Sequence, residues 1–137
     1  MGVVIDTSVL IDLEKGRIKY SDNVTGRENE DFFISVITVS ELLHGVLRAE
    51  DPKVRNSRSA FVESLISSIP VLPLDVSVAR AHAQLWAELK SQGIMIGLHD
   101  SWIAAICIAH GYSLITSNIR EFGRVPGLRS EFWAMQQ

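Results

Sequence analysis

Short apolar runs alternate along the chain with longer segments in which apolar residues recur every three or four positions. The short runs predict buried strands, at 2–5, 32–36, 71–74 and 112–116, with 128–133 as a candidate short fifth. The longer segments predict helices, at 7–16, 38–50, 52–68, 76–93 and 99–111. Residues 16–31 are polar and interrupted by glycine, so we expect mostly loop there.

Strands that alternate with helices predict an α/β fold with a central, mainly parallel sheet of four to five strands flanked by helices. The chain has 137 residues, of which 47% are apolar, and we expect a single domain over 1–137. In such sheets, ligands bind beyond the carboxyl ends of the strands. Helices that lead back into a parallel strand begin at that same edge.

Three acids fall at this edge. Asp6 follows the first strand, Glu41 is expected in the first turn of the helix after the second strand, and Asp100 in the first turn of the helix before the fourth. Carboxylates that face one another repel, and none of the three segments contains an obvious lysine or arginine to neutralise them. A hard divalent cation, Mg²⁺ or Mn²⁺, would do so through oxygen ligands.

Each acid also has a structural explanation. Asp6 would cap the helix that follows it, unless Thr7 or Ser8 does so. Glu41 stands three residues after Thr38, the spacing of a capping box. Asp100 in a first helical turn is favoured by the helix dipole. The metal hypothesis therefore depends on the three acids being at one place.

Charge and composition narrow the choice of partners and location. The net charge of −3 gives no overall field that attracts nucleic acid. RNA would need a local basic patch, for which two stretches are candidates: Arg48, Lys53, Arg55 and Arg58, and Arg120, Arg124 and Arg129. We expect a cytoplasmic protein without membrane association. The chain has one cysteine, and we find neither a basic N-terminal leader nor an apolar run long enough to span a membrane.

Four segments together resemble one family: VVIDTSVLIDL, SVITVSELLHGV, IGLHDSWIAAICIAHGYSLITSNIREF and VPGLRSEFW. The opening Asp-Thr motif is weakly specific alone, but it is followed in order by Ser-Glu-Leu-x-x-Gly and Asp-x-x-Ile-Ala-Ala. The set resembles the PIN-domain family, and within it the VapC-type toxins of toxin–antitoxin pairs. The resemblance covers nearly the whole chain and is weakest over 14–31 and 48–70.

This resemblance implies a PIN-like fold and a Mg²⁺-dependent endoribonuclease, with Mn²⁺ as a substitute ion. The family's acids map onto Asp6, Glu41 and Asp100, which would be the catalytic and metal-binding residues. Thr7 and Thr116 would support them through hydroxyl hydrogen bonds, although both also suit ordinary cap and strand-end positions. The expected partners are an RNA substrate, a small VapB-type antitoxin and a second copy of the chain in a homodimer.

One position departs from the family pattern. Many relatives carry a fourth acid just after the fourth strand, where this chain has Thr116, Ser117 and Asn118. Asn118 offers an amide oxygen without charge, and Glu121 would supply a carboxylate if its segment bends inward. The departure puts a second metal site in question.

Other functions remain open on the sequence. A PIN-like scaffold could bind RNA or protein without cleaving it. A receiver-type signalling module would use Asp75 as phosphoacceptor, but it needs a second acid near Asp6 and a later lysine that the chain lacks. A haloacid-dehalogenase-type phosphatase needs Asp-x-Asp, and position 8 is serine.

Overall fold

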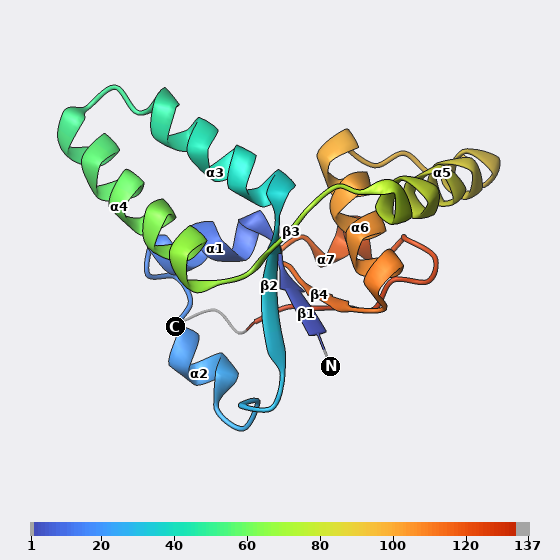
Figure 1. The fold of residues 1–137 in the computed structure, drawn as a ribbon, viewed down its shortest axis with the longest axis horizontal. Coiled ribbons are helices and arrows are strands. Elements are labelled where there is room, and N and C mark those ends of the chain that lie inside the picture. The colour runs from blue at the N-terminus through green and yellow to red at the C-terminus, as the bar shows by residue number, and fades with distance from the viewer. Residues whose placement is uncertain (1, 134–137) are drawn as a thin grey trace.

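The computed structural model describes residues 2–133, and its centre is a five-stranded sheet (Figure 1). Every pair of neighbouring strands is parallel, and the strand order is β3-β2-β1-β4-β5. The strands are β1 (Gly2–Ile5), β2 (Asp31–Ser35), β3 (Val71–Leu72), β4 (Ser113–Ile115) and β5 (Ser130–Glu131). The predicted α/β class, the parallel sheet and the short fifth strand are confirmed.

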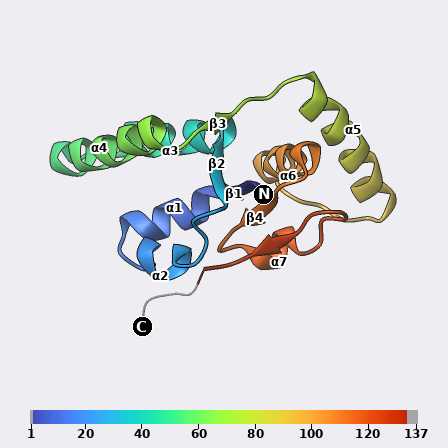
Figure 2. The same ribbon diagram turned by 60° about the horizontal axis from the view of Figure 1, so that its bottom comes forward.

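Helices cover both faces of this sheet (Figures 1 and 2). They are α1 (Thr7–Glu14), α2 (Tyr20–Val24), α3 (Val36–Arg48), α4 (Pro52–Ser68), α5 (Val76–Ser91), α6 (Leu98–His110) and α7 (Ile119–Phe122). The α3–α4 pair lies on one side of the molecule and the α5–α6 pair on the other. Within the described range, no helix combines the length and apolarity needed to span a bilayer.

Two apolar clusters hold the layers together, and β1 contributes to both because it is central. Val3 and Ile5 are fully buried in the cluster that includes residues of α1, α3 and α4. Val4, on the opposite face of the strand, is fully buried in the cluster that includes residues of α5 and α6. Side chains alternate between faces along a strand, so a strand buried on both sides is apolar at every position. The chain then reaches Asp6 with its backbone fixed.

The structure corrects three expectations about elements. The predicted loop 16–31 contains α2, whose Tyr20 ring packs edge-to-face against Phe32 and Trp133, at centroid distances of 6.4 and 5.7 Å. A second short helix, α7, was also not predicted. The third strand ends at Leu72 rather than at residue 74, because Pro73 has no backbone N–H to continue the ladder. Contacts between distant segments, rather than local pattern, stabilise α2.

Candidate active site

Asp6 lies where β1 ends, and its carboxylate is held by hydroxyl groups. Its backbone N–H donates to the carbonyl of Ile115 (2.8 Å), and its side chain is almost fully buried. Oδ2 accepts hydrogen bonds from Ser8 Oγ (2.6 Å) and Thr116 Oγ1 (2.8 Å). Asp6, rather than Thr7 or Ser8, occupies the N-cap position of α1, but its side chain makes no capping hydrogen bond. The capping explanation therefore does not account for this carboxylate.

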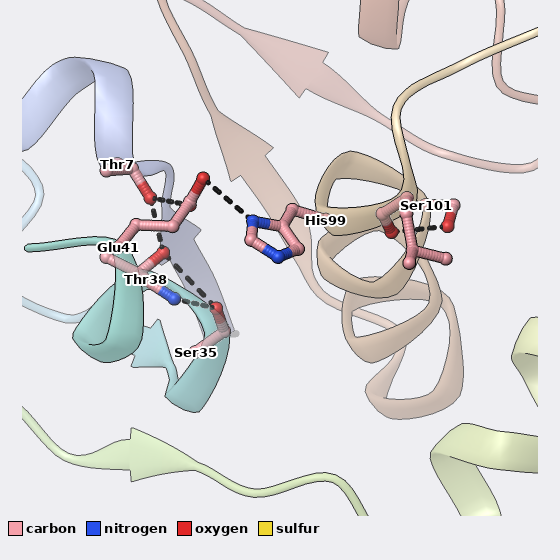
Figure 3. Close-up of polar contacts among 7 residues, drawn as sticks. Thr7, Ser35, Thr38, Glu41, His99 and Ser101 are labelled. Atoms are coloured by element: carbon pink, nitrogen blue, oxygen red, sulfur yellow. Dashed lines mark hydrogen bonds and ion pairs between the residues drawn. The ribbon is translucent and has the colours of Figure 1, made fainter. Parts of the chain in front are cut away.

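Glu41 is in the second turn of α3, not in the first turn as the sequence analysis expected. The helix begins earlier because Ser35 is its N-cap, and Ser35 Oγ accepts from the Thr38 N–H (3.0 Å). The capping-box prediction for Thr38 and Glu41 is therefore wrong. Instead, Glu41 receives a 2.6 Å hydrogen bond from the Thr7 hydroxyl at Oε1, and its Oε2 lies 3.3 Å from His99 Nδ1 (Figure 3).

Asp100 lies in the first turn of α6, as predicted. Its pKa is raised to about 6, mainly by burial and then by the negative charges of Asp6, Glu121 and Glu41, while His99 opposes the rise. Burial also raises the pKa of Asp6, against the hydrogen bonds that its carboxylate accepts, with a further contribution from Glu41. Asp6 after β1 and the acids of α3, α6 and α7 thus share one electrostatic environment.

The donor set suits a hydrated hard cation. In residues 2–133, no lysine or arginine forms an ion pair with Asp6, Glu41 or Asp100. No three acid, imidazole or thiol side chains of that range are grouped tightly enough to bind one ion directly. Mg²⁺ usually keeps several waters and takes only one or two carboxylates from the protein. Carboxylates without a lysine or arginine partner, whose negative charges help to raise the pKa of Asp6 and Asp100, therefore fit such an ion, with water completing its shell.

The two candidates for the fourth position differ in their surroundings. Asn118 is exposed and precedes α7, with its backbone N–H donating to Thr116 Oγ1 (2.9 Å). Glu121, inside α7, accepts from the Gly97 N–H (3.1 Å) and lies 3.7 Å from Arg124 Nη2. Because Glu121 contributes to the raised pKa of Asp100, it is the carboxylate on the α7 side of the site.

Sequence reasoning missed part of the hydrogen-bond network around the site. Ser8 accepts from the Ser117 N–H (3.0 Å), and Ser117 Oγ donates to Asp12 (2.6 Å), which also accepts from Arg17 (3.1 Å). These contacts fasten the segment after β4 to α1. Ser8 and Asp12 are four residues apart on a helix and so share a face. That spacing was the sequence signal from which their shared position beside the site could have been predicted.

His99 was also not counted among the predicted site residues. Its only sequence signal was its place beside Asp100 in a first helical turn. Asp75, considered above as a phosphoacceptor, caps α5 by accepting from the Val78 N–H (2.9 Å). The acidic site of this chain is therefore the one around Asp6.

Comparison with known proteins agrees with this architecture. The PIN domain family model matches residues 3–128. Ribonuclease VapC1 of Rickettsia felis is 38% identical over 128 residues, which are 93% of each chain. The tRNA(fMet)-specific endonuclease VapC of Shigella flexneri is 40% identical over 101 residues, 74% of each chain. The crystal structure of VapBC2 from Rickettsia felis, bound to a promoter DNA fragment, contains a chain with a similar fold. The two chains superpose with a TM-score of 0.88 and are 26% identical, and the match covers 98% of this chain and 100% of that one.

The family model, the sequence relatives and the solved structure thus agree on one family. The family model spans β1, α3 and α6, so it includes Asp6, Glu41 and Asp100. The chain belongs to the PIN-domain family, within the group of the VapC proteins.

Proposed function

We propose that this protein is a Mg²⁺-dependent endoribonuclease that acts as the toxin of a type II toxin–antitoxin pair. One observation supports this most directly. Asp6, Glu41 and Asp100 accumulate negative charge at the carboxyl edge of the sheet with no lysine or arginine paired to them in residues 2–133. Metal-dependent phosphodiester hydrolysis needs such a cluster of oxygen donors.

The residues have separate roles in this proposal. Asp6 and Asp100 would hold Mg²⁺, or Mn²⁺ in its place, and Glu41 would either ligate the ion or orient its water. Thr7 and Thr116 keep the carboxylates of Glu41 and Asp6 in position. Bound there, a divalent ion supplies neutralising charge to the phosphate and makes water more acidic for attack on phosphorus.

The partners follow from the relatives. Because the Shigella flexneri relative is named a tRNA(fMet)-specific endonuclease, tRNA is the first RNA to test. The structural neighbour is a VapBC complex, so we propose a small VapB-type antitoxin as the protein partner. We also propose a cytoplasmic location, because such an RNA substrate is found there.

A homodimer is part of the same proposal. Trp86 on α5, Met95 in the following loop and Leu98 at the start of α6 are 62%, 85% and 68% exposed. These three residues line a mostly apolar hollow of about 400 Å³ together with residues of α5 and α6. Large apolar side chains gathered on one surface mark protein interfaces, and we assign this surface, which we call the α5–α6 surface, to a second copy of the chain.

The decisive experiment combines two measurements. Purified protein is incubated with labelled tRNA in Mg²⁺ and in a chelator, and we expect cleavage only with the ion. In cells, expression should arrest growth, and co-expression of the antitoxin encoded in the adjacent reading frame should restore it. A non-cleaving scaffold would bind RNA in both buffers without producing fragments, and the proposal would then be wrong.

A further inference from the structure

A pocket of about 560 Å³ lies beside the acidic site, between α1, α3 and α4. Thr7, Glu41 and His99 line the end that it shares with the site. Figure 3 shows these three side chains directed toward one another from α1, α3 and α6. The pocket is therefore continuous with the acidic site at these residues.

The face of α3 that lines this pocket is acidic at the end near the site, at Glu41, and basic at the far end, at Arg48. Glu41, His44, Gly45 and Arg48 all line it. Their spacing of three, four and seven residues places them on one face of the helix. Arg48, at the end away from the site, is exposed and has no ion-pair partner in residues 2–133. A helix rises about 1.5 Å per residue, so there is room for a nucleotide between Glu41 and the free guanidinium.

Gly45 gives the second indication of a ligand. It lies in the middle of α3, where glycine weakens a helix relative to alanine. A Cβ at this position would meet no atom within 4 Å. No packing contact inside the described chain therefore requires glycine here. The backbone faces open pocket instead, as it does where a ligand approaches closely.

The remaining walls suit the flat apolar face of a nucleobase. Leu10, Leu42 and Val62 are buried behind the pocket, and the half-buried ring of Phe61 lines it. Arg58 completes one wall, where it donates a hydrogen bond to the Gly45 carbonyl (3.1 Å) and forms an ion pair with Glu14 (3.7 Å), which lines the pocket as well. Single-stranded nucleic acids bind through stacking on such surfaces and through cations that meet the backbone.

We propose that this pocket is a nucleotide subsite, which takes the base adjacent to the scissile phosphate while Arg48 contacts a flanking phosphate. The proposal rests on the function proposed above, because the acidic end is where the phosphodiester must lie. Continuity with that end and the unpaired cation favour RNA over an apolar protein segment, which would leave the Arg48 charge uncompensated.

Binding of a fluorescein-labelled single-stranded RNA of about ten nucleotides, measured by anisotropy in chelator at low ionic strength, tests the subsite without cleavage. Gly45→Leu fills the pocket and should weaken binding about tenfold, as for a lost stacked base. Arg48→Gln should lower the slope of log K against log salt by about 0.7, as for one lost phosphate contact on a single strand. Arg80→Gln, which removes an exposed arginine from α5, is the matched control and should leave both values unchanged.

Thermal melting checks that each variant folds, and Leu is a better helix former than Gly, so Gly45→Leu should melt no lower than the wild type. Equal RNA affinity in Gly45→Leu and the wild type would overturn the subsite, and is also the result expected of a pocket made for a protein segment. A similar loss of affinity in Arg80→Gln would overturn it too, since the effect would then be general charge. Cleavage in Mg²⁺ is assayed separately and reports on the proposed function. If the wild type binds RNA but does not cleave it, only the proposed function is refuted. If the wild type cleaves RNA but Gly45→Leu and Arg48→Gln bind it as the wild type does, only the subsite is refuted.

Discussion

The Thr7 hydroxyl donates a 2.6 Å hydrogen bond to Oε1 of Glu41, joining the first residue of α1 to the second turn of α3. Thr7 Oγ1 also lies 3.0 Å from Thr38 Oγ1. A hydroxyl has a single proton, so with that proton on Glu41, Thr38 is the donor in the second contact. The carboxylate orientation thus depends on a buried network that reaches back to the N-cap residue Ser35.

We predict that Thr7→Val lowers Mg²⁺-dependent RNA cleavage by about tenfold, the usual effect of removing a residue that orients a metal-site carboxylate. Valine has the shape of threonine but cannot donate to Glu41. Thr7→Ser keeps the hydroxyl and should retain most of the activity. Equal losses in both variants would mean that Thr7 acts through packing alone.

Asp6→Asn and Asp100→Asn should each abolish Mg²⁺-dependent cleavage, because each removes a charged oxygen that we propose as a ligand of the ion. Both variants should stay folded, since asparagine has nearly the same size as aspartate. Asp75→Asn is the matched control: it makes the same change at the N-cap of α5, where asparagine caps as well as aspartate, and should cleave normally. Full activity in either site variant would show that the acids are wrongly assigned.

The raised pKa of Asp100 predicts how stability depends on pH in the absence of metal. With a pKa of about 6 in the folded protein and an ordinary value near 3.8 when unfolded, the folded state binds more protons between these values. Stability should therefore fall as pH rises from about 4 to 7 and change little above that. Asp100→Asn should remove this part of the dependence and raise the metal-free melting temperature near pH 7.5 by a few degrees. Thermal melts in chelator at several pH values measure it; a wild-type melt that is flat from about pH 4 to 7 would contradict the shared negative environment.

The acids could be found from sequence because topology fixes them. A residue that follows a buried parallel strand, such as Asp6, or that begins a helix returning to the sheet, such as Asp100, must lie at the carboxyl edge. Glu41 was placed in the right region for a partly wrong reason, since Ser35 rather than Thr38 starts the helix. Helix boundaries depend on which of several capable side chains caps, and local sequence does not decide this.

Contacts between distant segments could not be predicted. The hydrogen bond from Ser117 to Asp12 joins residues 105 positions apart, and the His99–Glu41 contact joins residues 58 positions apart. Both depend on the distance between α1, α3 and α6 after the core has packed. Likewise, α2 is stabilised by Tyr20 against Trp133 rather than by its own sequence.

If the α5–α6 surface forms the homodimer interface, a charged substitution on it should convert the dimer into a monomer. Met95 is 85% exposed, so Met95→Glu should not disturb folding. A charge in the centre of an apolar interface is costly to desolvate, and this variant should elute as a monomer where the wild type elutes as a dimer. Leu47→Glu on α3, at a site 73% exposed, is the control and should leave the dimer intact. Light scattering after gel filtration distinguishes the two, and a wild-type monomer would refute the homodimer.

The absence of an acid at position 118 predicts the number of metal ions bound. The three carboxylates of Asp6, Glu41 and Asp100 with one divalent ion leave a net charge near −1. Because Arg124 lies near Glu121 and partly neutralises this further carboxylate, a second ion would make the site positive. Oxygen-ligand sites bind hard cations more tightly as ligand charge rises. We therefore expect the free protein to bind one Mn²⁺ tightly and a second only with the RNA phosphate. Asn118→Asp places a carboxylate at the exposed position that precedes α7, and this variant should bind two ions without RNA.

Calorimetric titration of Mn²⁺ into both proteins measures the number of ions directly, and Glu121→Gln is the informative companion variant. Glu121 already accepts from the Gly97 N–H and lies near Arg124, so its carboxylate is partly neutralised and should contribute little to a second site. Two tight sites in the wild type would contradict the expected charge limit. If one of those two sites disappeared in Glu121→Gln, Glu121 would be the missing fourth carboxylate. Glu121 would then supply, three residues later, the charge that Asn118 lacks.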